Sequence, residues 1–127
     1  RIPLKSEGGA RLQARTVGIC VGSSFKHLDI PGEETYLNRG VSFCPHCDGP
    51  LFTDRKIAVM GGGNSAIEAA IDLAGIAREV TVIDIADSLK ADKVLVKRLK
   101  SLSNNRVNHS PNSTISLSDA PRFVLRH

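Results

Sequence analysis

Three consecutive glycines, Gly61 to Gly63, separate a short apolar run from a segment with helical periodicity. The run at residues 56–60 is continuous and apolar, which is typical of a strand inside a parallel sheet. After the glycines, apolar residues recur at the i, i+3, i+4 and i+7 spacing of one helix face. These residues are Ile67, Ala70, Ile71 and Ala74. The pattern predicts a strand, a tight turn and a helix that stops at Gly75.

The alternation continues downstream. Residues 79–84 form a β-branched run that predicts a second strand, and residues 88–102 predict a second helix. The apolar face of this helix comprises Ala91, Leu95, Leu99 and Leu102. Residues 106–109 predict a third strand, whereas residues 110–120 show little apolar periodicity. Strand, helix and strand in this order define a right-handed βαβ unit, so the sequence predicts an α/β, Rossmann-like fold.

The glycine turn has the form G-x-G-x-x-A. Gly61 permits a tight turn off the strand, and Gly63 lets the backbone approach a pyrophosphate without an intervening Cβ. Gly62, Asn64 and Ser65 complete the turn, where the first helical N–H groups face the phosphates. Ser65 also stands three residues before a glutamate, the spacing of a capping box. We therefore expect a bound dinucleotide; the alternative is a plain strand–helix turn.

Asp84 ends the second strand, about 20 residues after Gly61. An acid at this position accepts hydrogen bonds from the adenosine ribose hydroxyls and repels a 2′-phosphate. The next residues, Ile85 and Ala86, supply no cation. The sequence therefore predicts NADH rather than NADPH, with Lys90 as the nearest residue that could hold a 2′-phosphate.

Cys44 and Cys47 are separated by two residues, a spacing that permits a disulfide to open and close readily. His46 between them, when protonated, would stabilise a neighbouring thiolate. Asp48 follows Cys47 and could exchange protons during thiol–disulfide transfer. Together with the glycine turn, the pair predicts electron transfer from a nicotinamide to a disulfide.

Two other interpretations of the cysteines remain open. A zinc site needs about four ligands at regular spacing, and no second C-x-x-C occurs, so no metal is expected. A purely structural pair of reduced thiols is the other alternative. Cys20 lies in an apolar run at residues 14–21, which predicts a buried strand in which this cysteine acts as a small hydrophobe.

Length and composition narrow the function classes. A chain of 127 residues is the size of one domain. No apolar run approaches the roughly 18 residues of a membrane span, and the first residues lack a secretory signal, so we expect a cytoplasmic protein. The net charge of +4 comes largely from residues 90–100, a pattern typical of a solvated helix face. With one Tyr and no Trp, nucleic-acid binding is not expected.

Two segments closely resemble a known family. Residues 44–50 (CPHCDGP) and 61–70 (GGGNSAIEAA) are similar to the flavin-containing subunit of alkyl hydroperoxide reductases, which is grouped with the thioredoxin reductases. The likeness extends from about Gly9 to about Asn112. It implies two Rossmann-like domains, one for FAD and one for NAD(P)H, with the redox pair in the latter.

The resemblance also implies roles for the pair. Cys47 would face the flavin, Cys44 would exchange with an acceptor disulfide, and Asp48 would be the acid–base group. The acceptor would be a peroxiredoxin or thioredoxin-like protein, and the intact enzyme a homodimer. Thioredoxin reductases carry His-Arg-Arg where this chain has Asp84-Ile85-Ala86, which again favours NADH.

The chain also departs from this family. It has no glycine-rich FAD fingerprint, and Cys20-Val21-Gly22 stands in place of the family's Ala-Thr-Gly. We therefore expect a remnant of the flavin domain at residues 1–25, the NAD(P)-binding domain at 26–116, and a diverged or truncated tail at 117–127. The competing functions are part of a flavoprotein disulfide reductase, a non-catalytic dinucleotide-binding module, and a zinc-binding or thiol-exchange adaptor.

Overall fold

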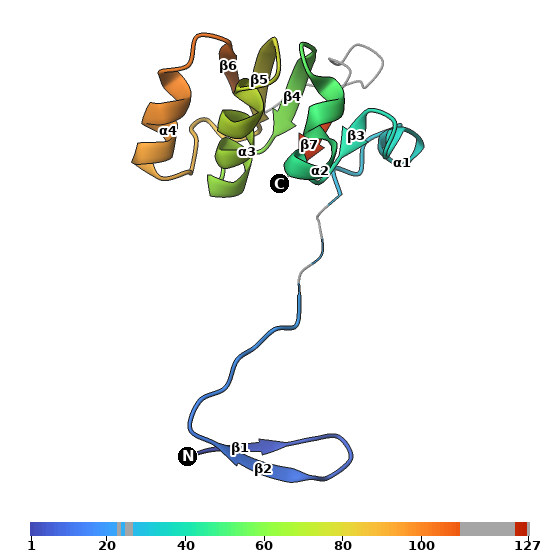
Figure 1. The fold of residues 1–127 in the computed structure, drawn as a ribbon, viewed down its shortest axis with the longest axis vertical. Coiled ribbons are helices and arrows are strands. Elements are labelled where there is room, and N and C mark those ends of the chain that lie inside the picture. The colour runs from blue at the N-terminus through green and yellow to red at the C-terminus, as the bar shows by residue number, and fades with distance from the viewer. Residues whose placement is uncertain (23, 25–26, 110–123, 127) are drawn as a thin grey trace.

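The computed structural model describes residues 1–22, 24, 27–109 and 124–126. An antiparallel hairpin comes first, formed by β1 (Ile2–Lys5) and β2 (Arg11–Ala14). An extended segment then leads to an α/β unit that holds all the remaining elements (Figure 1).

A five-stranded parallel sheet forms the centre of the α/β unit, in the order β3-β7-β4-β5-β6. Its strands are β3 (Val41–Ser42), β4 (Lys56–Met60), β5 (Glu79–Asp84), β6 (Asn105–His109) and β7 (Val124–Arg126). The predicted strands at β4, β5 and β6 are confirmed, as is the α/β, Rossmann-like class. The sequence pattern predicted no strand at β7, which the structure inserts between β3 and β4.

Helices cover the sheet. They are α1 (Glu33–Tyr36), α2 (Pro45–Asp48), the 3-10 helix η1 (Gly49–Phe52), α3 (Asn64–Ala74) and α4 (Lys93–Lys100). The longest, α3, packs against β4, β5 and α4, and Figure 1 shows α3 and α4 side by side on one face of the sheet. The tight link between β4 and α3 places the glycine turn at the carboxyl edge of the sheet.

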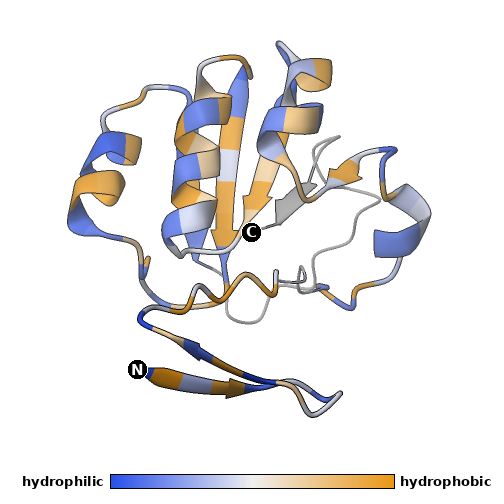
Figure 2. Ribbon diagram, turned by 60° about the horizontal axis from the view of Figure 1, so that its bottom comes forward, coloured by the Kyte–Doolittle hydropathy of each residue, from blue (hydrophilic) through white to orange (hydrophobic). Residues whose placement is uncertain are grey.

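The main core lies between this helical layer and the sheet. Ile67, Ala70 and Ile71 of α3 are buried, so the predicted apolar stripe is confirmed. They meet alternate residues of the strands, including Val59 and Val82, which are fully buried. Each such side chain contributes about 1.5–3 kcal/mol relative to exposure. Figure 2 shows the hydrophobic residues concentrated along the central strands.

The second predicted helix is shorter than expected: α4 begins at Lys93, not at Ser88. The amides just before it bond elsewhere, because the N–H groups of Lys90 and Ala91 both donate to the carbonyl of Gly62. All four predicted apolar residues nevertheless join the core, Leu99 fully buried, but Ala91 and Leu102 lie outside α4.

Two other local predictions are wrong. The capping box does not form, because Gly63 occupies the N-cap and Ser65 already lies inside α3. Residues 15–22 are exposed and have no regular secondary structure, in place of the predicted buried strand at 14–21. Residues 15–22 pair with no strand in the described part of the chain, and Cys20 is therefore exposed rather than buried.

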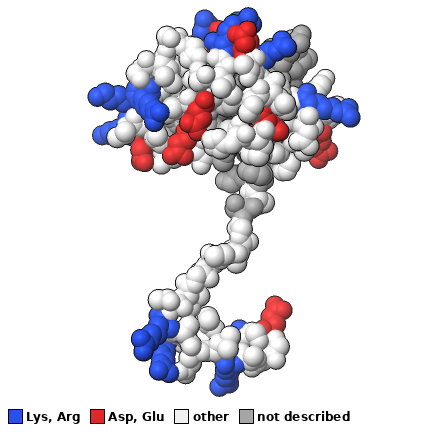
Figure 3. Space-filling view, viewed as in Figure 1, with Lys and Arg blue, Asp and Glu red and all other residues white. Residues whose placement is uncertain are grey.

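Basic side chains gather over α4 (Figure 3). Lys97, Arg98 and Lys100 occupy its last turn, where cations interact favourably with the carbonyl end of the helix dipole. These side chains are exposed, as expected for a solvated face. In the described ranges of the chain, no helix has the length and apolar character that crossing a membrane requires.

Candidate active site

The cysteine pair forms a disulfide, Cys44–Cys47, with a Cα–Cα distance of 5.3 Å that lies within the usual range. Helix α2 produces this proximity. Cys44 is its N-cap, and Pro45 takes the first helical position, where a missing N–H costs nothing. The backbone N–H of Cys47 donates to Cys44 Sγ at 3.2 Å. Cys47 is exposed and Cys44 is half-buried, so a reacting partner can reach the pair.

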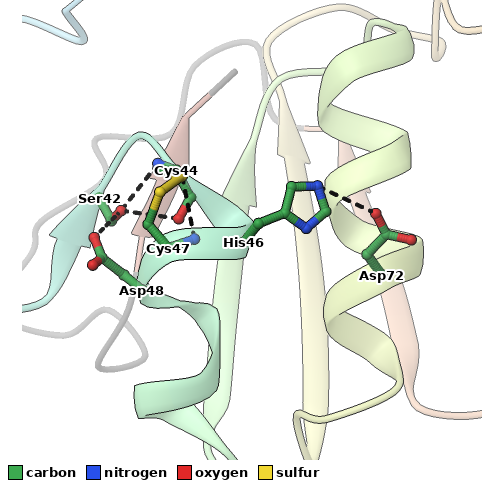
Figure 4. Close-up of a disulfide and its surroundings, with 6 residues drawn as sticks. All are labelled: Ser42, Cys44, His46, Cys47, Asp48 and Asp72. Atoms are coloured by element: carbon green, nitrogen blue, oxygen red, sulfur yellow. Dashed lines mark hydrogen bonds and ion pairs between the residues drawn. A yellow bond between two sulfur atoms is a disulfide. The ribbon is translucent and has the colours of Figure 1, made fainter.

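Ser42, which sequence reasoning missed, lies directly beside the pair. Its hydroxyl accepts the backbone N–H of Cys44 at 3.1 Å and donates to Asp48 Oδ2. Figure 4 shows Ser42 and Asp48 together on one side of the disulfide. The available signal was a small polar residue between Val41 and Phe43, immediately before the C-x-x-C motif.

His46 points away from the disulfide (Figure 4). Its Nε2 lies 3.8 Å from Asp72 Oδ2 on α3, and both side chains are largely exposed. The expectation that His46 stabilises a thiolate is not supported by this geometry. The imidazole instead links α2 to α3.

The glycine turn has the conformation that the sequence predicts. Gly61 has φ 117°, a value that L side chains rarely adopt, and its N–H donates to the carbonyl of Ile83 at 2.8 Å. A Cβ on Gly62 would come within 2.8 Å of Asp84 Cγ and closer still to its Oδ2, so a side chain at this position would displace the Asp84 carboxylate. A Cβ on Gly63 would meet nothing within 4 Å. Gly63 therefore faces open space at the start of α3.

The side chain of Asn64 is engaged within the protein. Its Nδ2 donates to Asp92 Oδ2 at 3.0 Å, and its Oδ1 accepts the N–H of Asp92 at 2.8 Å. Asn64 thus ties the start of α3 to the start of α4. Ser65 is exposed in the first turn of α3.

Asp84 ends β5 and lies against Gly62, at the carboxyl edge where the sequence predicts the ribose. Its register partner on β6 is His109, whose Nδ1 lies 2.9 Å from the carbonyl oxygen of Ala86. No motif indicated His109, because the contact depends on the pairing of β5 with β6. The imidazole fixes the backbone that follows Asp84.

These features fit a dinucleotide pyrophosphate. The first α3 amide that bonds within the helix is that of Ile67, which donates to the carbonyl of Gly63. The N–H groups of residues 64–66 therefore point out of the helix start, toward the open space at Gly63. Among the residues that the structure describes, no group of three or more His, Cys, Asp or Glu side chains could hold a metal ion.

A cleft with a volume of about 500 Å³ separates the disulfide helix α2 from α3, and neither cysteine nor Gly61–Gly63 lines it. Pro45 and His46 of the disulfide helix line one side, and Ser65 and Glu68 of α3 line the other. A parallel sheet that carries a glycine turn and an accessible disulfide is the combination expected of the class of nucleotide-linked disulfide oxidoreductases.

Comparison with known proteins identifies the family. The sequence profile of the pyridine nucleotide-disulphide oxidoreductases matches residues 2–121, and the chain belongs to this family. The predicted resemblance is thereby confirmed.

The relatives include both expected groups. The chain is 47% identical over 123 residues to the F subunit of alkyl hydroperoxide reductase from Xanthomonas campestris pv. phaseoli, covering 97% of this chain and 23% of that protein. It is 57% identical over 103 residues to the same protein from Staphylococcus aureus, covering 81% and 20%. Thioredoxin reductase from Streptococcus pyogenes has a similar structure, with TM-score 0.72 and 32% identity over 93% of this chain and 45% of that one. The chain thus spans less than a quarter of the curated relatives' length.

Proposed function

We propose that the chain is the nicotinamide-binding and disulfide-bearing part of an NADH-dependent flavoprotein disulfide reductase. The observation that carries the proposal is that one α/β unit holds both an accessible Cys44–Cys47 disulfide and a glycine turn at the start of α3, with α2 and α3 on the two sides of one cleft. A dinucleotide fold alone would not require the disulfide, and a structural disulfide would not require the glycine turn.

The nucleotide would be held mainly by backbone groups. Gly61 sets the turn, Gly63 leaves room for the pyrophosphate, and the N–H groups of Asn64 and Ser65 face it. The carboxylate of Asp84 would accept hydrogen bonds from the ribose hydroxyls. NADH is favoured over NADPH because Ile85 and Ala86 offer no positive charge to a 2′-phosphate.

The disulfide would carry the electrons onward. A flavin, when bound, accepts a hydride from the nicotinamide and delivers two electrons to a disulfide. Cys47, the more exposed of the pair, would meet the flavin, and Cys44 would exchange with the acceptor. Asp48 would take up and return the proton that each exchange step moves.

The acceptor would be a peroxiredoxin or a thioredoxin-like protein. The names of the relatives support this choice, since an alkyl hydroperoxide reductase needs a peroxide-reducing component.

The intact enzyme would be a cytoplasmic homodimer. Residues 1–25 would belong to its flavin domain, because Ile2, Leu4 and Leu12 of the hairpin are exposed apolar residues that lack a cover within the described part of this chain.

A non-catalytic dinucleotide-binding module is the second candidate. It is favoured by the glycine turn, which by itself suffices to hold a dinucleotide without electron transfer to the disulfide.

A reconstitution assay separates the two candidates. The chain is mixed with NADH, an aromatic disulfide dye and the flavin-bearing part of a relative whose own redox cysteines are replaced by serine. The reductase proposal predicts dye reduction that needs all components and is abolished by Cys47→Ser. Dye reduction that proceeds equally with Cys47→Ser, or without flavin, would contradict it.

A further inference from the structure

Ser42 is a buried polar residue with an exposed fraction of 2%, in a strand whose other residue, Val41, is apolar and equally buried. A buried hydroxyl is costly unless it has hydrogen-bond partners. All the partners of the Ser42 hydroxyl in the described residues belong to the redox segment: it accepts the N–H of Cys44, donates to the carboxylate of Asp48, and lies 3.5 Å from the carbonyl oxygen of Cys44. The hydroxyl therefore connects the start of α2 to its end.

We propose that Ser42 is a positioning residue for thiol–disulfide exchange, acting through Asp48. This inference rests on the proposed acid–base role of Asp48. Ser42 donates to Oδ2 of the carboxylate, and Oδ1 makes no hydrogen bond to any residue that the structure describes. One oxygen is thus fixed by the strand, and the other is left for the proton of a neighbouring thiol.

The chemistry requires a base at this position. In the oxidative half-reaction, one cysteine thiolate attacks the acceptor disulfide, forms a mixed disulfide and releases one acceptor thiolate. The second cysteine must then lose its thiol proton to attack that mixed disulfide. Asp48 accepts this proton, the Cys44–Cys47 bond forms, and the second acceptor thiolate leaves. The dithiol loses two electrons and the acceptor gains them.

The geometry explains why a hydroxyl is needed at this position. An alanine or valine would leave the N–H of Cys44 and the carboxylate of Asp48 without their shared partner. The carboxylate could then rotate away from the pair, since the Ser42 hydroxyl is its hydrogen-bond partner within the described part of the chain. Proton transfer falls steeply when the base leaves hydrogen-bond reach.

The test measures the rate at which the reduced chain, with Cys20→Ser to remove the exposed third thiol, reacts with an aromatic disulfide dye in a stopped-flow instrument. We expect Asp48→Asn to slow release of the second dye thiolate by about 100-fold, the lower range for a general base. Ser42→Ala should slow the same step by about tenfold. In the Asp48→Asn background, Ser42→Ala should slow it by less than about twofold.

Ser42→Thr and Ser42→Val form a matched pair, because their side chains have the same shape and differ by the hydroxyl. Threonine should react at least about fivefold faster than valine. Equal rates for this pair, or an equal effect of Ser42→Ala in both backgrounds, would overturn the inference and leave Ser42 a structural role. If Asp48→Asn reacts at the wild-type rate, the proposed role of Asp48 fails, and the inference fails with it. If Asp48→Asn is slow and Ser42→Ala is not, only the inference about Ser42 fails.

Discussion

Gly62 is the position in the glycine turn where an added methyl group would overlap another side chain, that of Asp84. Its side-chain position is occupied: a Cβ would overlap Asp84 Oδ2 and lie 2.8 Å from Asp84 Cγ and 3.2 Å from Leu89 Cδ2. Real Cβ atoms essentially never approach another heavy atom closer than 3.0 Å. Since Gly62 is not among the glycines with positive φ, Gly62→Ala tests steric overlap rather than backbone strain.

Overpacking a filled site costs about 1–3 kcal/mol. For a domain of this size, that cost lowers Tm by roughly 4–12 °C. The displaced group is the Asp84 carboxylate, so Gly62→Ala should also weaken NADH binding. Gly63→Ala is the matched control: its φ is −83° and its Cβ meets nothing within 4 Å, so it creates no overlap, and replacing the N-cap of α3 should lower Tm by less than Gly62→Ala does.

The two variants should separate stability from binding. Gly63→Ala keeps the fold but fills the space proposed for the pyrophosphate, so its NADH affinity should fall by at least about tenfold. Melting is followed by circular dichroism, and binding by isothermal titration calorimetry. A Gly62→Ala protein that melts within about 1 °C of wild type, on the order of the error of such a scan, would refute the steric argument. A Gly63→Ala protein with unchanged NADH affinity would refute the pyrophosphate site.

Three further predictions concern the rest of the site. The chain should bind NADH more tightly than NADPH by calorimetry, and Asp84→Ser with Ala86→Arg should narrow or reverse this preference, each change contributing about 1–2 kcal/mol; equal affinities in the wild type would exclude Asp84 as the ribose ligand. Mass spectrometry after alkylation should find one reactive thiol, Cys20, in the oxidised protein and three after reduction; labelling of Cys44 before reduction would contradict the disulfide. His46→Ala should lower the free energy of unfolding by less than about 1 kcal/mol, because both His46 and its partner Asp72 are largely exposed. A larger loss, measured as a fall in Tm, would contradict the description of this contact as an exposed ion pair.

Periodicity and glycine chemistry predicted the centre of the fold. The strands at β4, β5 and β6 and the buried face of α3 depend on contacts between residues close in sequence, or on patterns that any buried strand must show. The C-x-x-C disulfide could be predicted for the same reason, since one helical turn brings the two cysteines together.

Features that depend on long-range contacts could not be predicted. The late start of α4 reflects amides that bond to Gly62, and the position of β7 reflects pairing with β3 and β4. The exposure of Cys20 shows that an apolar, strand-like run stays unpaired unless a neighbouring strand is present. Ser42 escaped notice because its partners become adjacent only when β3 and α2 pack together.

The reduction potential of the Cys44–Cys47 pair tests the central claim most directly. The chain is equilibrated in thiol–disulfide buffers of graded potential, and the fraction of reduced pair is measured by alkylation and mass spectrometry, with Cys20→Ser to remove the third thiol. A redox-active centre predicts one two-electron transition between about −200 and −290 mV, the range of thioredoxin-like and glutaredoxin-like disulfides. A midpoint below about −300 mV, where structural disulfides lie, would contradict the account.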